Sequence, residues 1–445
     1  MNLKNSLVSG TIILTLSGLL SRVIGFFYRI FLSQRFGEEA MGIYQLINPL
    51  LGLTYALCIS GIQSAISKQI AEKASKKVLY IGMTISFVLS SLCTLFLLKY
   101  ASFLATEFFY EERLVPLIKV LALSLPFSTI HSCINGYFYG KKEAKHPAVL
   151  QLIEQLARVL SVVVIFYIND AKGVETPLYV TVSGLFVGEI CSSLFSILFY
   201  RLEGRKKYTA RVSSTSTIVL EIFKYSIPLT TTRIVVGLLQ SVENIYIPQN
   251  LLLAGYSTEE ALSLFGVLSG MALPFIMFPT AITNSLSSML LPAVSEQNAE
   301  KSTSHLGHTL KKSISFCMLL GFLCFAAFFV FGKFLGNLLF HSSLAGTFIM
   351  SLSFICPFLY TNTSLSAIIN GLGKTGFTFF INIVSTLIRL FFVFCLIPKW
   401  GILAYLWGVL ISQLFAFLVS FAYINKQFHL FHKEDFKHPV SKKYV

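Results

Sequence analysis

About twelve apolar runs, each long enough to cross a lipid bilayer, follow one another along the whole chain. A membrane-spanning helix needs about 20 mostly apolar residues. Charged residues make up only 12% of the chain, whereas soluble domains carry about 25%. The sequence therefore predicts an all-α polytopic membrane protein of about twelve transmembrane helices. The predicted spans are 8–32, 42–65, 79–98, 114–139, 148–168, 178–200, 227–247, 264–290, 314–331, 347–369, 377–397 and 402–424.

The basic residues between these runs indicate how the chain is oriented. With the N-terminus placed inside, the inner segments carry 23 of the 35 Lys and Arg, and the outer segments and the spans carry six each. Lys and Arg concentrate in cytoplasmic loops. The sequence therefore predicts a multi-pass protein of the cell membrane with both termini in the cytoplasm. The same placement explains the net charge of +15 without a nucleic acid partner.

Two short patterns occur once in each half of the chain. Asn135-Gly136 precedes the basic loop after the fourth span, and Asn370-Gly371 precedes the one after the tenth. Gly61–Ser67 and Ala281–Ser287 mix polar and apolar residues at the inner ends of the second and eighth spans. We predict a parallel repeat of two six-helix lobes, arranged as a V around a central cavity. The expected parts are an N-terminal lobe at 1–200, a cytoplasmic linker at 201–226, a C-terminal lobe at 227–424 and a basic tail at 425–445.

Arginines inside the spans are the main candidates for substrate binding. Arg22 and Arg29 are seven residues apart in the first span and so share a helix face. Arg233 follows three threonines in the seventh span, and Arg389 lies in the eleventh. Charge within a membrane is costly and usually faces the bundle interior, where guanidinium groups bind phosphate bidentately. The alternatives are that Arg29 extends toward the interface and that Arg22 and Arg389 pair with carboxylates. For Arg233, the alternative is that the neighbouring threonines form hydrogen bonds between helices.

The acidic residues in the spans are candidates for ion coupling or for ion pairing. Glu154 and Arg158 are four residues apart in the order that favours a local ion pair. Glu189 is a possible partner for Arg389, and Glu243 near an outer helix end is either a coupling site or an interfacial carboxylate. His131 is the sole histidine within a span and is expected to be a buried core residue.

Several chemistries have no signature in the chain. No GxxxxGK[ST] phosphate loop, no GxSxG motif and no pair of catalytic carboxylates is present, so we expect neither ATP hydrolysis nor enzymatic catalysis. The eight Cys fall inside apolar runs without a CxxC pair. We expect no metal, no cofactor and no catalytic residue, with transport coupled to a Na⁺ or H⁺ gradient or to the membrane potential. A monomer is the expected oligomeric state.

The segment Leu20–Ile30, followed by Phe36–Tyr44, resembles the start of the polysaccharide-flippase and stage V sporulation protein B family. This family belongs to the multidrug/oligosaccharidyl-lipid/polysaccharide exporter superfamily. The loops at 135–142 and 370–374 are similar to its repeated inner-loop signatures. The resemblance implies a flippase for undecaprenyl-pyrophosphate-linked saccharides, with Arg22 and Arg29 at the positions of arginines that contact the pyrophosphate.

The resemblance leaves the cargo and two other functions open. Lipid II flippases have two further C-terminal spans, so an exopolysaccharide or spore-envelope precursor is as good an expectation as lipid II for this chain. One alternative is a cation-coupled multidrug exporter of the same superfamily, which needs an acidic cavity in the N-terminal lobe. The other is a membrane glycosyltransferase or polymerase, which needs acid and base carboxylates on an outer loop.

Overall fold

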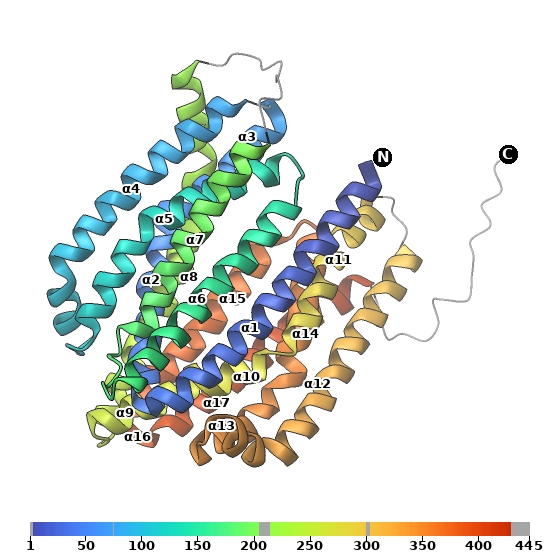
Figure 1. Ribbon diagram of the computed structural model, residues 1–445. Helices are drawn as coiled ribbons and strands as arrows, with labels where there is room; N and C mark the ends of the chain where they lie inside the picture. The colour runs from blue at the N-terminus through green and yellow to red at the C-terminus, as the bar shows by residue number, and fades with distance from the viewer. Residues whose placement is uncertain (1–2, 74, 204–213, 300–302, 429–445) are drawn as a thin grey trace. The chain divides into compact units, whose positions relative to one another are not determined.

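The computed structural model describes residues 3–73, 75–203, 214–299 and 303–428 of the chain, which are almost entirely helical and contain no strand (Figure 1). The predicted all-α membrane architecture is thereby confirmed. Helix packing divides the chain into two compact units, with the boundary between Met271 and Ala272.

The N-terminal unit consists of nine α-helices joined by short loops or by π-helical turns. In Figure 1, α4 and α5 of this unit run side by side, in agreement with their packing. Its elements are α1 (Leu3–Leu46), α2 (Asn48–Tyr55), the π-turn η1 (Ala56–Ser60), α3 (Gly61–Lys73), α4 (Lys76–Phe103), the π-turn η2 (Leu104–Phe108), α5 (Leu114–Gly140), α6 (Lys145–Ala171), α7 (Val180–Leu202), α8 (Thr215–Leu253) and α9 (Thr258–Gly266).

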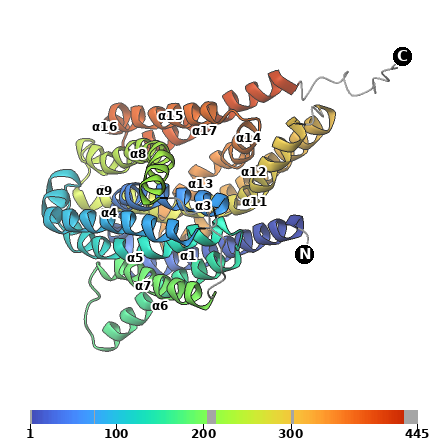
Figure 2. The ribbon, with the colours of Figure 1, turned by 90° about the horizontal axis from the view of Figure 1, so that it is seen from above.

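The C-terminal unit follows a further π-turn, η3 (Val267–Ala272). Figure 2 shows α15 and α17 of this unit lying side by side, as their contacts require. Its elements are α10 (Leu273–Met277), α11 (Thr280–Ala299), α12 (Thr303–Phe340), α13 (Ser343–Leu352), the 3₁₀ turn η4 (Ser353–Ile355), α14 (Cys356–Gly371), α15 (Thr375–Phe391), the π-turn η5 (Phe392–Leu396), α16 (Ile397–Trp400) and α17 (Ile402–Phe428).

Ten helical stretches in the described residues are long and apolar enough to cross a membrane. The first, Ile13–Glu72, has 60 residues and contains the first two predicted spans. The seventh predicted span lies within α8, whose polar residues keep it out of the ten. The ten stretches and α8 together account for all twelve predicted spans.

Two predicted spans have different limits in the structure. The second begins within α1, because the helix is interrupted at Gly37, whose φ of 81° places it in the left-handed region, and the residues from Glu38 to Leu46 continue toward α2. The eighth is not one helix. Its two prolines, Pro274 and Pro279, separate η3, α10 and α11, since proline cannot donate the backbone hydrogen bond that a continuous helix needs.

The boundary between the two compact units lies after Met271, not within the predicted linker at 201–226. Residues 204–213 lie outside the described residues, and from Thr215 onward the chain is already the first part of α8. That helix packs on α2 and α3, and α9 packs on α1, so both belong to the N-terminal unit. In the predicted tail, residues up to 428 complete α17 and the others lie outside the described ranges.

The repeated Asn-Gly pattern marks an equivalent close contact in each unit. A Cβ atom on Gly136 of α5 would lie 2.8 Å from the carbonyl oxygen of Gln63 on α3. A Cβ atom on Gly371 of α14 would lie 2.9 Å from the carbonyl oxygen of Leu291 on α11. In the N-terminal unit, the glycine therefore lets the helix of the fourth span approach that of the second. In the C-terminal unit, it lets the helix of the tenth span approach that of the eighth. This shared contact supports the predicted internal repeat.

Candidate functional site

A close contact between α6 and α7 builds the polar centre of the N-terminal unit. A Cβ atom on Gly184 would lie 2.6 Å from the carbonyl oxygen of Arg158, and one on Gly188 would lie 2.8 Å from that of Glu154. Two glycines four residues apart present a smooth helix face, which allows the backbones to approach closely. The contact brings Glu189, next to Gly188, to the level of Glu154.

Three ionisable side chains from three helices meet at this level. The Nδ1 atom of His131 on α5 lies 2.9 Å from a carboxylate oxygen of Glu189, and its Nε2 atom lies 3.9 Å from Glu154. The ionisable atoms of the three residues lie within 4.8 Å of one another. His131 and Glu189 are each only 6% exposed. We call His131, Glu154, Glu189 and the adjoining Arg158 the polar cluster.

Arg158 supplies the one permanent positive charge of the polar cluster. Its Nη2 atom donates a hydrogen bond of 2.5 Å to Glu154, one helical turn earlier on α6. The local ion pair expected from the sequence is therefore present. Glu189, which the sequence offered as a partner for Arg389, has its carboxylate against His131.

A chain of hydroxyl groups leads away from the polar cluster. Ser132 Oγ lies 3.3 Å from His131 Nε2 and 3.3 Å from the hydroxyl of Tyr55, which is half-buried at the end of α2. Tyr55 immediately precedes the π-turn η1, and such turns often occur at functional sites. On the other side of the cluster, Tyr28 of α1 donates a hydrogen bond to the Thr181 carbonyl on α7.

Arg22 and Arg29 lie on α1, as predicted, with different surroundings. Arg22 is exposed and Arg29 is half-buried. Within the described part of the chain, neither guanidinium has a carboxylate at ion-pair distance. Both positive charges are therefore available to an anion, in contrast to Arg158.

Arg233 and Glu243 lie on α8. Arg233 is exposed, and none of the carboxylates in the described ranges pairs with it. One turn before it, Thr230 contacts the helix of the second span, where a Cβ atom on Gly61 would lie 2.2 Å from its hydroxyl. Glu243 is 4% exposed, so its side chain is buried within the N-terminal unit.

Arg389 is the fourth predicted arginine and belongs to the C-terminal unit. It is half-buried in the last turn of α15, and its Nη2 atom lies 3.4 Å from the hydroxyl of Thr386. The structure thus places three of the four candidate arginines in the N-terminal unit and one in the other.

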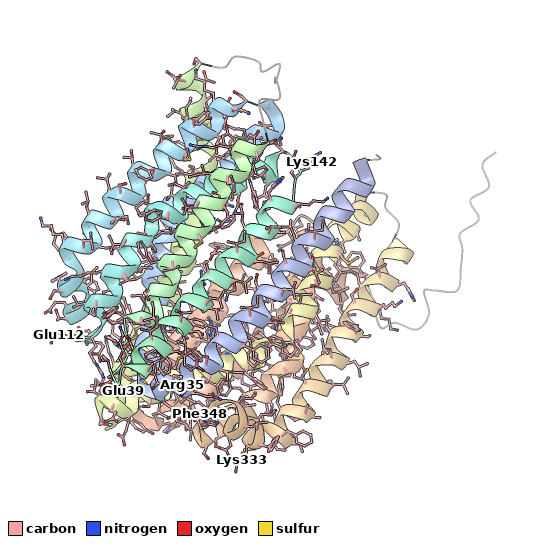
Figure 3. The ribbon with its side chains drawn as sticks, in the orientation of Figure 1. Arg35, Glu39, Glu112, Lys142, Lys333 and Phe348 are labelled. Carbon is pink, nitrogen blue, oxygen red and sulfur yellow. The ribbon has the colours of Figure 1, made fainter. Side chains whose placement is uncertain are left out.

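A second polar site lies at the opposite end of the N-terminal unit from the loop at 141–144. Figure 3 shows Arg35 and Glu39 at one end of this unit and Lys142 at the other. Arg113 forms ion pairs of 2.7 Å with both Glu39 and Glu111, beside a cavity of about 780 Å³. The hydrogen bonds that Arg113 donates to the Glu111 carboxylate are the main cause that holds the pKa of Arg113 above its ordinary value, so the positive charge of this arginine is compensated by nearby carboxylates.

The sequence missed the part that His131 plays in the polar cluster. Its predicted role, a buried core histidine, is right about burial but overlooks its two carboxylate neighbours. The available signal was that this is the sole histidine in a span, together with two acids in the next two spans. Intramembrane ionisable residues usually have partners in neighbouring helices.

Known proteins resemble this chain in sequence and in structure. Stage V sporulation protein B of Bacillus subtilis (strain 168) is 28% identical over 437 residues, which cover 95% of this chain and 84% of that protein. A multidrug resistance transporter of the MATE family and MOP superfamily, solved in an inward-facing conformation, has a TM-score of 0.74 at 15% identity, covering 92% and 94% of the two chains. Lipid II flippase MurJ, solved in an inward closed conformation, has a TM-score of 0.73 at 14% identity, covering 93% and 87%.

Two family descriptions match the sequence. The MatE family matches residues 234–395. The family of polysaccharide biosynthesis proteins matches residues 7–296, more than half of the 445 residues. The chain thus belongs to the polysaccharide biosynthesis protein family, and it is a multi-pass membrane transporter of the MOP superfamily rather than an enzyme.

Proposed function

We propose that this chain is a flippase that moves an undecaprenyl-pyrophosphate-linked saccharide from the inner to the outer leaflet by alternating access. The observation that carries the proposal is the set of arginines without carboxylate partners on helices of the N-terminal unit. Arg22, Arg29 and Arg233 have no such partner among the described residues, whereas Arg158 and Arg113 do.

Uncompensated guanidinium groups within membrane-spanning helices favour an anionic cargo. A charge at membrane depth is stable only when it is paired or hydrated, so an arginine without a carboxylate partner is suited to bind an anion. The planar guanidinium matches a phosphate oxygen pair through two parallel hydrogen bonds. A diphosphate linking a sugar to a long isoprenoid supplies this anion and also remains anchored in the membrane.

The relatives are consistent with a cargo of this class. One is named for a stage of sporulation and another as a lipid II flippase, so lipid II, an exopolysaccharide unit and a spore-envelope precursor all fit the proposal. The predicted central cavity, the cell-membrane location with cytoplasmic termini, and the monomeric state are parts of the same proposal. Surrounding membrane lipids and the cargo are the only partners that it requires.

The test is translocation by the full chain reconstituted in liposomes. The probe is a fluorescent undecaprenyl-pyrophosphate-linked disaccharide, and a membrane-impermeant quencher reports its transfer between leaflets. Hydrogen bonds to charged groups contribute about 1.5–3 kcal/mol each, so Arg22→Ala should slow translocation roughly 10- to 100-fold. Arg22→Lys keeps the charge but loses the bidentate geometry and should fall between the two.

The matched control is Arg201→Ala. Arg201 is an exposed arginine in the last turn of α7 that no part of the proposal uses. It should flip the probe at the wild-type rate. Wild-type translocation by Arg22→Ala in correctly folded protein would refute the role of α1 in cargo binding.

A cation-coupled multidrug exporter is the second candidate, because the MatE family matches residues 234–395. An exporter of organic cations needs uncompensated acid in its binding site. In the N-terminal unit, Glu154 is neutralised by Arg158, and Glu189 lies against His131. Efflux of a cationic dye from the same liposomes, without movement of the lipid probe, would favour the exporter.

A further inference from the structure

We propose that the polar cluster is a proton-binding site, in which one exchangeable proton is held between His131 and Glu189. The site would be where transport is coupled to the proton gradient. Its coupling role depends on the proposed function, but proton binding by the cluster does not.

The charges of the cluster require one further positive charge. Ionised Glu154 and Glu189 contribute two negative charges, and Arg158 contributes one positive charge. With a neutral imidazole the cluster carries a net charge of −1, and one proton on His131 makes it neutral. An uncompensated charge is costly in a low-dielectric interior, so the cluster is built to take up a single proton.

The geometry suits a proton better than a metal ion. In the imidazolium form, the protonated Nδ1 atom of His131 lies 2.9 Å from the negative Glu189 carboxylate, and its Nε2 atom lies 3.3 Å from Ser132 Oγ. Arg158 already occupies one oxygen of Glu154 at 2.5 Å. A metal cation would have to displace this guanidinium or lie beside it, and like charges at that distance repel.

The cluster lies well inside the membrane-spanning helices. His131 is nine residues before the end of α5, and Glu154 is nine residues after the start of α6. At a rise of 1.5 Å per residue, both lie about 13.5 Å from the loop that joins these helices. Ionisable residues at such depth commonly mark proton pathways.

A path to the cluster is visible in the described residues. The hydroxyls of Tyr55 and Ser132 connect a half-buried position on α2 to the imidazole. Tyr28 and Tyr44 of α1 are the other ionisable groups close to Arg158. Tyrosine keeps its proton at neutral pH, so these phenols do not alter the charge count.

Only the N-terminal unit offers membrane carboxylates for coupling. From residue 272 to residue 428 the sequence contains two acids: Glu296, in the last turn of α11, and Glu300, which lies outside the described residues. The membrane-spanning helices of the C-terminal unit therefore have no acidic side chain in their predicted spans. Any carboxylate-based coupling must use the first half of the chain.

The direct test observes the protonation of His131 in the full chain. The protein is labelled with ¹⁵N-histidine and placed in lipid nanodiscs, and the His131 signal is identified by its absence in His131→Gln. We expect an imidazolium at about pH 6 that loses one proton as the pH rises across the range in which histidine titrates. In Glu189→Gln the cluster is already neutral without that proton, so His131 should be a neutral imidazole at the same pH.

His146→Gln is the matched control. His146 lies at the start of α6, 3.7 Å from Glu143 and stacked on Phe138, and is not part of the cluster. Its removal should leave the His131 signal unchanged. A His131 imidazole that stays neutral down to about pH 5 would overturn the proposal, and so would an imidazolium signal that Na⁺ displaces at constant pH.

The coupling role is tested by the liposome assay under an imposed pH gradient. We expect the wild type and His146→Gln to respond to the gradient and His131→Gln to lose that response while still binding the lipid probe. Loss of probe movement in the wild type together with normal His131 titration would count against the cargo, not against the proton site. A gradient response retained in His131→Gln would overturn the coupling role.

Discussion

The contact between α6 and α7 predicts an unusual outcome for a small substitution, Gly188→Ala. The added Cβ atom would lie 2.8 Å from the Glu154 carbonyl oxygen, where ordinary contacts begin near 3.4 Å. The helices must therefore separate by about 0.6 Å, and overpacking of this kind costs about 1–3 kcal/mol. Alanine regains about 0.5–1 kcal/mol through its helix preference. The net expectation is a loss of roughly 1 kcal/mol.

The same separation should weaken the neighbouring polar cluster. A shift of α7 by about 0.6 Å lengthens the 2.9 Å contact between His131 and Glu189 by up to that amount, to at most about 3.5 Å, the limit of a hydrogen bond. Gly188→Ala should thus alter the ¹⁵N signal of His131 as well as stability. A purely local packing effect would change stability alone.

The assay compares thermal unfolding of Gly188→Ala and Gly52→Ala in the same detergent. Gly52 lies inside α2, and a Cβ atom there would have no neighbour within 4 Å. This control should raise the melting temperature, whereas Gly188→Ala should lower it, by about 2–4 °C for each kcal/mol in a large domain. Equal increases in both variants would refute the inferred close contact of α6 and α7.

Two further predictions concern the other polar site and the orientation of the chain. Arg113→Ala should lower the melting temperature because it leaves the buried Glu111 without its partner, and Arg113→Lys should restore part of the loss. Because the folded-state pKa of Arg113 is raised, its stabilising effect is present below the unfolded pKa, so no loss is expected as the pH rises to about 10. In a Cys395→Ser background, an impermeant maleimide should label Glu112→Cys in intact cells and Lys142→Cys only after permeabilisation; the reverse would contradict the predicted orientation.

The membrane-spanning helices could be predicted from hydrophobicity alone. Each long apolar run must avoid water, so it has to lie inside the protein or against lipid. The third to sixth predicted spans agree with α4 to α7 within a few residues. Interruptions were harder to place. The proline-separated eighth span and the bend at Gly37 depend on backbone geometry that mean hydropathy does not report.

The site was predictable only where its partners share one helix. Glu154 and Arg158 are four residues apart, so helical periodicity alone placed them together. His131 and Glu189 meet because α5 packs on α7, while glycines of α7 bring α6 close, and these arrangements are properties of packing. The paired state of Arg113 and the unpaired state of Arg22 likewise depend on contacts between distant segments.

The Asn-Gly contact shared by the two units has a consequence for how the halves of the chain have diverged. Gly136 and Gly371 make the same kind of close helix contact, yet only the half that contains Gly136 carries acids within its predicted membrane spans. Acidification can therefore change the charge within the predicted spans of one unit while leaving the charge within the spans of the other constant. The two units would share a packing pattern, but only one of them would respond to pH.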